Sequence, residues 1–352
     1  MGQFDSIKRD PWMVEQHYLA SICEKEREFA NPERGAHFDL IKREPLLQEK
    51  FYLDDVSYLK EKYFERRAEE FLARSWPDYV NVEGLSWGWC FQSLELLIEL
   101  YSGGEPMVSL RPYAEHVFSQ FQRHKQAFPD FSLKIWEPDA YQFALWLLSF
   151  AVLLDKPSRI GQIAAWLNDS PADGQDLLLR QLFVRVGVTF PGSVLIHEQP
   201  YNELLSAVSS EGDEQQQALR AYLKKWYRGM RNCYWHDRHK ARSDAGFFGY
   251  WAFEAGLVTV LWGVDDTPYR DLPFYPKDLV DDARKRQVIK SFPEQLQSAP
   301  YSDALARSGE ICPRTGVWVC DEWAVGPQTF MQGVEMPSEN GRSLVWRLVK
   351  GL

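Results

Sequence analysis

The chain has 352 residues, a formal net charge of −10 and 45% hydrophobic residues, so it is long enough for two domains with a substantial core. Non-specific nucleic-acid binding needs clustered lysine and arginine, and the acidic balance argues against it. Five cysteines with no CxxC pair argue against a disulfide framework or a zinc knuckle, and a reducing cytoplasm is the simplest location. Cys312 and Cys320 could pair across a hairpin, but two free thiols packed as small hydrophobes are preferred.

Neither a membrane span nor a secretory signal is expected. The longest apolar run, residues 140–154, is shorter than the ~18–20 residues that cross a bilayer, and it reads as a buried core helix. The first residues contain no apolar segment typical of a signal peptide. Gly2 and Ser6 match a myristoylation pattern, which is short enough to be treated as chance.

The first half of the chain has helical periodicity. Residues 1–50 are polar and charge-mixed and form a weakly helical extension. From Leu53 the pattern strengthens, and residues 54–76 are predicted to form one helix that ends at Pro77. Further helices are predicted at residues 86–102, 112–128, 138–154, 159–167 and 174–187. Gly103 and Gly104 are expected to close the first of these.

A turn-rich stretch at residues 168–174 is the predicted boundary between two helical parts. The helices predicted after this boundary lie at residues 200–209, 213–230, 249–262 and 276–292. Almost no alternating pattern occurs before Phe292, which favours an all-α body.

The C-terminal tail has a different pattern, because from about residue 308 onward successive side chains alternate between the two faces of a predicted strand. Leu344, Trp346 and Leu348 face one side of a predicted strand. We therefore expect a mostly α protein with a two-part helical body and a small C-terminal β module. The predicted parts are an N-terminal extension (1–50), two helical domains (51–172 and 173–292) and a β tail (293–352).

The stretch that follows the apolar helix 249–262 is acidic and rich in proline. Gly263 fits the helix cap, the three prolines Pro268, Pro273 and Pro276 stiffen the chain, and Pro276 opens the next helix. Six charged residues are predicted to be displayed there: Asp265, Asp266, Arg270, Asp271, Lys277 and Asp278. Two interpretations stay open. The residues form a rigid recognition surface, or the acids cap helices and brace Arg270 and Lys277.

Glu254 is the one acid of the apolar helix 249–262. A lone buried carboxylate is costly unless it is paired. The preferred interpretation is a structural salt bridge to an arginine or lysine in the core, and a functional acid is the alternative.

His236, Asp237 and His239 raise the possibility of a metal site and hence of a metal-dependent hydrolase. Their spacing is not that of a common zinc site, and surface or capping histidines are the preferred interpretation. Searches for phosphate-binding, dinucleotide-binding, zinc-protease and serine-hydrolase motifs find nothing. The sequence therefore predicts a protein that is not an enzyme and has no catalytic residues, metal or cofactor.

The run "FFGYWAFEAGLVTVLWGVDDTPYRDLPFYPKDLVDDAR", residues 247–284, resembles the hallmark of the PoNi family, bacterial immunity proteins against PoNe-type nuclease effectors. The chain departs mildly from the family pattern at Gly256, Thr267-Pro268 and Leu272. The segment "YLKKWYRGMRNCYWHDRHK" resembles the part that precedes the hallmark, and residues from about 50 resemble the family's N-terminal domain more loosely. The tail is similar to a β tail of other immunity proteins linked to type VI secretion.

This resemblance implies an all-α, two-part fold and a cytoplasmic, non-enzymatic protein that binds and blocks a basic DNase toxin. Such a toxin holds phosphate, so an acidic partner is complementary to it. Neither nucleic acid nor membrane is an expected partner, and a homodimer is left open. The competing hypotheses are the metal-dependent hydrolase and a non-catalytic adaptor in which the acidic stretch only braces the fold.

Overall fold

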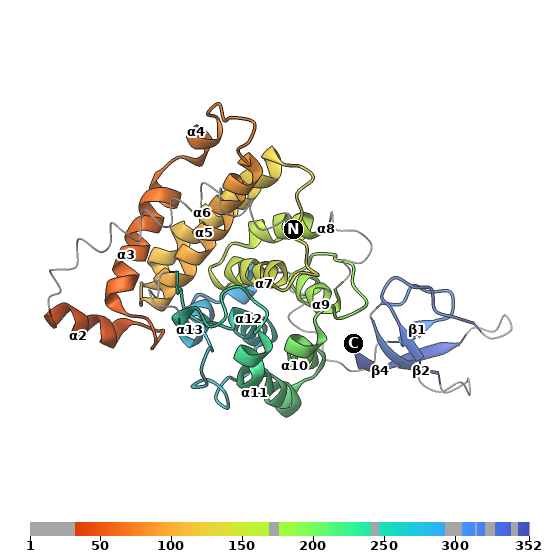
Figure 1. Cartoon of the computed structure of the whole chain (residues 1–352). Helices are drawn as coiled ribbons and strands as arrows, with labels where there is room; N and C mark the ends of the chain where they lie inside the picture. The colour runs from red at the N-terminus through yellow and green to blue at the C-terminus, as the bar shows by residue number, and fades with distance from the viewer. Residues whose placement is uncertain are drawn as a thin grey trace, which may run out of the picture. The chain divides into compact units, whose positions relative to one another are not determined.

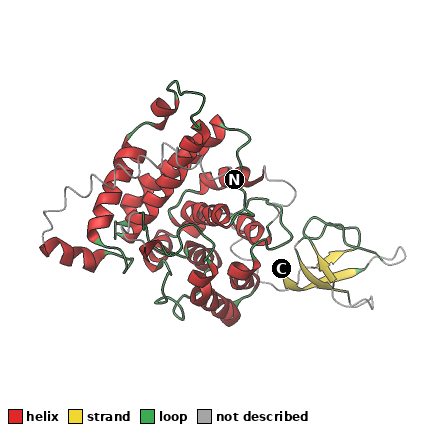
Figure 2. Ribbon diagram, in the orientation of Figure 1, coloured by secondary structure: helices red, strands yellow, loops and turns green. Residues whose placement is uncertain are grey.

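The computed structural model describes residues 32–168, 176–240, 246–292, 305–313, 315–320, 328–338 and 344–351. Most of this part of the chain is helical, and short strands occur near its C-terminal end (Figure 2). The predicted mostly α fold with a small C-terminal β module is confirmed. The expectations for residues 1–31, and for most of the turn-rich boundary at 168–174, lie outside the described residues.

The chain divides into two compact units. The N-terminal unit comprises Met1–Pro129 and Trp235–Tyr250, and the C-terminal unit comprises Asp130–Tyr234 and Trp251–Leu352. The segment Trp235–Tyr250 therefore returns to the N-terminal unit from the second half of the chain. The four-part division expected from the sequence differs from this packing and stays a prediction.

The N-terminal unit contains the hairpin of α5 (Val82–Ser102) and α6 (Met107–Ala127) (Figure 1). Asn81 caps α5, since its Oδ1 accepts from the Gly84 N–H (2.9 Å), and Gly103 ends the helix as predicted. Helix α6 begins at Met107, before the predicted start at residue 112. The other helical segments of this unit are α2 (Pro32–Ile41), α3 (Glu49–Leu59), π-helical η2 (Lys60–Glu65), α4 (Ala68–Leu72) and η4 (Arg238–Lys240).

The single helix predicted for residues 54–76 is wrong, because the backbone becomes extended at Arg66. The rings of Tyr63 and Phe71 both pack against the indole of Trp89, at centroid distances of 5.5 and 4.6 Å. On one continuous helix these two residues would be separated by about 12 Å along the axis, at 1.5 Å per residue. Packing of both rings on one indole therefore requires the break between η2 and α4.

Two almost wholly buried helices lie at the centre of the C-terminal unit. Helix α7 (Pro138–Leu153) packs against α12 (Phe253–Trp262), and every residue from Ala140 to Leu153 is buried. An apolar surface on all sides of a helix requires this burial. The remaining helical segments of the unit are η3 (Pro157–Arg159), α8 (Ile160–Asn168), α9 (Leu177–Arg185), α10 (Glu198–Ser209), α11 (Gly212–Gly229), α13 (Lys277–Arg286) and η5 (Val288–Ser291).

Helix α12 begins at Phe253, so the predicted start at residue 249 is wrong. Gly249 adopts a φ of +99°, a left-handed conformation that no α-helix contains. Ala252, the N-cap of α12, also has a non-helical backbone (φ −85°, ψ 67°), and its N–H donates to the Phe274 carbonyl (2.9 Å). The segment before Phe253 therefore lies outside the helix and is bonded to a residue far along the chain.

The C-terminal β module is a four-stranded antiparallel sheet with the order β1-β4-β2-β3. Its strands are β1 (Leu305–Arg307), β2 (Gly316–Val319), β3 (Gln328–Phe330) and β4 (Val345–Gly351). Trp318 and Trp346 are fully buried in its small core, with Leu344 beside them as the predicted alternation requires. Over the described residues, no strand precedes β1, which confirms the all-α body predicted up to Phe292.

Cys90, Cys233, Cys312 and Cys320 are free and buried, which confirms free thiols at residues 312 and 320. Among the described helices, none has both the length and the hydropathy needed to cross a bilayer.

Candidate functional site

The connection between α12 and α13 is a single short loop, residues 263–276, which we call the acidic loop. It begins at Gly263, whose left-handed conformation (φ +64°) ends α12, and the Val264 N–H bonds back to the Thr259 carbonyl (3.0 Å). It ends at Pro276, the N-cap of α13. Both ends were predicted from the sequence, and both are confirmed.

Asp266 lies at the centre of the acidic loop and is 4% exposed. One carboxylate oxygen accepts from Arg284 Nη1 (2.8 Å), and the other accepts from Tyr275 Oη (2.9 Å) and Arg270 Nη1 (3.1 Å). Arg284 Nη2 also donates to the Val264 carbonyl (2.6 Å). Asp266 therefore fastens the two halves of the loop to each other and to α13.

The surroundings of Asp266 keep its carboxylate ionised. Burial by itself raises the pKa of Asp266, but the hydrogen bonds from Arg284 and Tyr275 and the charges of Arg284 and Arg270 outweigh burial and lower the pKa below its usual value. Burial in turn works to lower the pKa of Arg284, and Asp266 more than compensates for it. Each charge is thus stabilised by its partner.

A second ion pair and an aromatic contact add to the rigidity of the loop. Both terminal nitrogens of Arg270 donate to Asp281 on α13, one of them at 2.9 Å, in the bidentate geometry that arginine favours. The pKa of Arg270 is raised chiefly by Asp281. The buried rings of Tyr269 and Tyr275 meet edge to face at 5.3 Å, and Tyr269 Oη is hydrogen-bonded to Thr259 Oγ1 (3.0 Å).

Phe274 adopts a φ of +71°, which is rare for a bulky residue. Its ring stacks on Tyr227 at a centroid distance of 5.6 Å and packs against Trp226 at 5.2 Å, and both of these residues belong to α11. Packing of the ring and the hydrogen bond from the Ala252 N–H to the Phe274 carbonyl together hold this backbone conformation, which nothing in the sequence predicts.

The six residues predicted to be displayed do not share one environment. They divide into exposed Asp265, Asp271 and Lys277, half-buried Arg270 and Asp278, and buried Asp266. The prediction that Asp266 is displayed on the surface is therefore wrong, because Asp266 pairs with two arginines inside the loop. Asp271 pairs with Lys277 at 3.3 Å on the surface. A toxin-binding role for the six residues stays a prediction.

Asp265 combines capping with exposure. Its Oδ1 accepts from the Thr267 N–H (3.1 Å) and from Thr267 Oγ1 (2.7 Å), and these bonds lower its pKa. The second oxygen of the carboxylate accepts from Gln216 of α11 (3.4 Å). A negative charge at a fixed position on the surface results.

The sequence did not predict that α11 lies beside the acidic loop. Gln216 Nε2 donates to the Asp265 carbonyl (2.9 Å), across a separation of 49 residues. Asp213 and Glu214, in the first turn of α11, are exposed. Asp213 lies three residues before Gln216 and hence on the same helix face. The acidic surface of the loop thus continues onto α11.

Glu254 on α12 is fully buried, but its partners are not cations. One oxygen accepts from Tyr222 Oη and from Trp226 Nε1 (2.6 Å each), and the other accepts from Gln142 Nε2 (3.3 Å). Among the described residues no lysine or arginine pairs with it, so the preferred interpretation of a core salt bridge is wrong. Burial raises the pKa of Glu254, and hydrogen bonds from Tyr222, from its own backbone N–H, from Trp226 and from Gln142 oppose that rise.

His236, Asp237 and His239 belong to the N-terminal unit, and their side chains have separate partners. Asp237 pairs with Lys240 (2.9 Å) and lies 3.7 Å from His236 Nδ1, while His239 Nδ1 is hydrogen-bonded to Tyr250 Oη (2.7 Å). Within the described ranges, no three His, Cys, Asp or Glu side chains are grouped to hold a metal ion.

The N-terminal unit also contains a group of buried and half-buried carboxyls that were not predicted from the sequence. Glu95 lies 3.3 Å from Arg238 Nη1, and Asp55 accepts from the Gly246 N–H (2.8 Å). Burial raises the pKa of Asp55 to about 6. The pKa of Glu99 is raised further by burial and by the charges of Asp55 and Glu95. The carboxyls come from α3 and α5, and their partners Arg238 and Gly246 come from the segment Trp235–Tyr250, so no local pattern connects them.

Comparison with known families gives two matches. The model of the N-terminal part of the PoNe immunity proteins (PoNi) matches residues 43–166, and the model of their C-terminal part matches residues 174–279. The gap between the two matches falls where the sequence predicts a boundary, and the acidic loop lies within the second match. No curated protein matches the chain.

Among solved structures, the chain is similar to the crystal structure of protein PA2201 from Pseudomonas aeruginosa. The TM-score is 0.54 at 21% sequence identity, over 76% of this chain and 98% of that chain. Identity at this level shows a shared fold. The two family matches show that the chain belongs to the PoNi family of PoNe immunity proteins.

Proposed function

We propose that this protein binds one cognate PoNe-type DNase effector in the cytoplasm and blocks it, protecting the producing cell and its kin. The observation that carries the proposal is the match of both PoNi models along residues 43–279. A type VI secretion system as the source of the effector is part of the same proposal. The partner is a protein, and its nuclease site must be basic enough to hold phosphate.

The acidic loop and the start of α11 are the surface that we propose for this contact. Asp265 and Asp271 are exposed on the loop, and Asp213 and Glu214 are exposed on α11. Like charges gathered on one surface favour a basic partner and accelerate the encounter.

The bracing of the loop adds to the proposed affinity. The bonds that converge on Asp266 fix the loop before any partner arrives. A loop that is already ordered loses less conformational entropy on binding, so more of the contact energy contributes to affinity. In this proposal Asp266 and Arg270 position the surface, and the exposed acids contact the nuclease.

The test is calorimetric and kinetic titration of the cognate nuclease with a double variant, Asp265→Asn and Asp271→Lys. Asparagine keeps the oxygen that caps Thr267, and Asp271 contributes only a surface ion pair, so the fold should be retained. We expect association to slow by at least about tenfold at low salt and the difference to shrink at high salt, as for rim charges.

The matched control is Asp130→Lys, which reverses a charge at an exposed aspartate of the same unit with no hydrogen bond or ion pair among the described residues. It should bind and protect like wild type. Asp213 is unsuitable as a control because Gln216 connects its helix face to the loop. If the loop double variant binds and protects like wild type, the contact surface lies elsewhere. If the wild-type protein does not bind the nuclease, the proposed function itself is wrong.

A further inference from the structure

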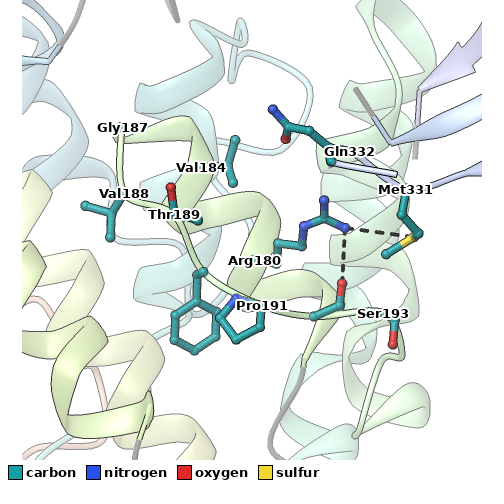
Figure 3. A pocket seen from close by; sticks show the side chains of 12 residues that line it. Arg180, Val184, Gly187, Val188, Thr189, Pro191, Ser193, Met331 and Gln332 are labelled. Carbon is teal, nitrogen blue, oxygen red and sulfur yellow. Dashed lines mark hydrogen bonds between the residues drawn. The ribbon is translucent and has the colours of Figure 1, made fainter. Parts of the chain in front are cut away.

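The C-terminal unit contains a pocket of about 660 Å³ that belongs to neither the acidic loop nor the Glu254 site. One wall is the segment 187–193, which follows α9, and the other is the turn 331–333 of the β module. Figure 3 shows the Arg180 side chain extending from α9 between Met331 and the Pro191–Ser193 segment. A volume of a few hundred cubic ångströms is typical of small-ligand sites.

Hydrogen bonds fix the first wall of the pocket to the start of α9. The Leu177 N–H donates to the Val194 carbonyl (2.9 Å), and the Ile196 N–H donates to Asp176 Oδ2 (2.9 Å). Gly192 approaches α9 so closely that a Cβ there would lie 2.1 Å from the Asp176 carbonyl oxygen. This wall is therefore formed before any ligand binds.

The second wall is fixed within the β module. The Gly333 N–H donates to the Cys312 carbonyl (3.0 Å), and the Gln332 N–H donates to Thr315 Oγ1 (2.9 Å). Gly333 has a φ of +88°, a conformation that favours glycine in a tight turn. These bonds hold the turn that carries Met331 at the pocket.

Arg180 is the feature of this pocket that calls for an explanation. It is 8% exposed, and its guanidinium donates to the Gly192 carbonyl (3.2 Å) and approaches Met331 Sδ (4.0 Å). Among the described residues, no carboxylate lies within 4.0 Å of its nitrogens. A guanidinium has five N–H donors, and burial without a counter-charge is costly. Burial accordingly lowers the pKa of Arg180.

We propose that this pocket binds a carboxylate carried on a small apolar body, with the Arg180 guanidinium as its counter-charge. The site is separate from the proposed contact with the nuclease and does not depend on it. The ligand carboxylate would accept the N–H groups that Gly192 and Met331 leave free, in the paired geometry that guanidinium and carboxylate favour.

The composition of the pocket favours a carboxylate over a phosphate. Of the described residues that line it, Arg180 alone is charged, so the site supplies one positive charge. A phosphate dianion needs more charge and more donors than this. Val184, Val188, Pro191 and Met331 provide apolar surface, which suits the body of a monocarboxylic acid. A free organic acid and the C-terminal carboxylate of a peptide share this chemistry.

The experiment measures binding to the full chain by calorimetry and by the thermal unfolding midpoint. The probes are benzoate, a short peptide ending in an apolar residue with a free carboxylate, and their amides as uncharged controls. Inorganic phosphate is the competing anion. At least one carboxylate should bind and raise the midpoint, and its amide should bind at least tenfold more weakly. Binding of benzoate alone identifies a free acid, and binding of the peptide alone identifies a chain terminus.

Two variants make the result specific to the pocket. Arg180→Met removes the charge and keeps an unbranched side chain, so it should abolish binding without lowering the unfolding midpoint. Val188→Trp keeps Arg180 but fills the pocket, and it should weaken binding at least tenfold. The proposal is overturned if neither carboxylate binds the wild type, if phosphate or the amides bind equally well, or if Val188→Trp binds like wild type. Should Arg180→Met fail to fold, Val188→Trp alone decides.

Discussion

Asp266 and Glu254 are two buried carboxylates of the C-terminal unit, twelve positions apart in the sequence, and their pKa values move in opposite directions. Asp266 accepts hydrogen bonds from two arginines and one tyrosine, and its pKa is lowered. Glu254 accepts from a tyrosine, a tryptophan and a glutamine, and its pKa is raised.

Each carboxylate accepts at least three hydrogen bonds, so the number of bonds does not explain the difference. Positive charge does, because a cation within a few ångströms offsets the desolvation of the anion and a neutral donor offsets only part of it. Asp266 lies in a loop whose neighbouring arginines reach solvent, whereas Glu254 lies in a helix that is buried on every side. The comparison separates a structural ion pair from a buried acid whose pKa is raised by burial.

The largest expected effect is that of Glu254→Ala, which leaves the Tyr222, Trp226 and Gln142 donors without an acceptor in the core. We expect a loss of roughly 2–4 kcal/mol in the free energy of unfolding, from the unpaired donors and the cavity. Chemical denaturation at pH 7 measures this value.

Glu254→Gln is the matched control, because it keeps the volume and one acceptor oxygen. It should remain within about 1 kcal/mol of wild type, since the Gln142 amide can reverse its orientation to suit the new group. A loss as large as that of the alanine variant would mean that the negative charge itself stabilises the fold.

Asp266→Ala should cost roughly 1–3 kcal/mol, somewhat less than Glu254→Ala. The substitution leaves Arg284 and Tyr275 without this acceptor. The side chains of Arg284 and Arg270 are each about one-third exposed, so water replaces part of the lost hydrogen bonding. Hydrogen exchange should show faster opening of residues 263–276 and unchanged protection of α7. Unchanged exchange in the acidic loop would contradict the central role given to Asp266.

The two acids should have opposite effects on the pH dependence of stability. Because the folded pKa of Glu254 lies above its ordinary value of 4.5, its favourable contribution is complete below that pH and is lost as the pH rises. Because the folded pKa of Asp266 lies below its ordinary value of 3.8, its contribution is present above that pH and is lost as the pH falls.

Unfolding free energies measured from pH 2 to pH 8 test this relation, because Asp266 loses its contribution only below its ordinary pKa of 3.8. Relative to wild type, Glu254→Gln should gain stability with rising pH, whereas Asp266→Asn should lose it. Profiles that change in the same direction would show that one of the two pKa directions is wrong.

The smallest expected effect is that of Asp271→Lys on stability. Its carboxylate is 87% exposed, and Lys277, itself half exposed, is its only ion-pair partner in the described part of the chain, so the unfolding midpoint should not change measurably. A clear loss of stability would show that the surface ion pair contributes to the fold.

Local sequence signals predicted the elements that depend on neighbouring residues. Gly263 ends α12 because a left-handed cap favours glycine, and residues 138–153 form a buried helix because they are apolar on every side. The alternating tail becomes the sheet that buries Trp318 and Trp346. Sequence resemblance also led to the PoNi family.

What the sequence did not predict depends on residues far apart in the chain. The break at Arg66 follows from two rings packing on Trp89, and the non-helical segment before α12 is hydrogen-bonded to Phe274. Nothing in the order of residues places Gln216 beside Asp265.

By itself, the sequence determined the helical body, the β module, the ends of the acidic loop and the excess of negative charge. Periodicity, capping and charge act over a few residues and can therefore be read along the chain. Only the tertiary structure decided that Asp266 lies inside the loop, that Glu254 pairs with neutral donors and with no cation among the described residues, and that Arg180 is buried at an open pocket. The partner of a buried charge is chosen by how helices pack, and packing brings together residues that no local pattern connects.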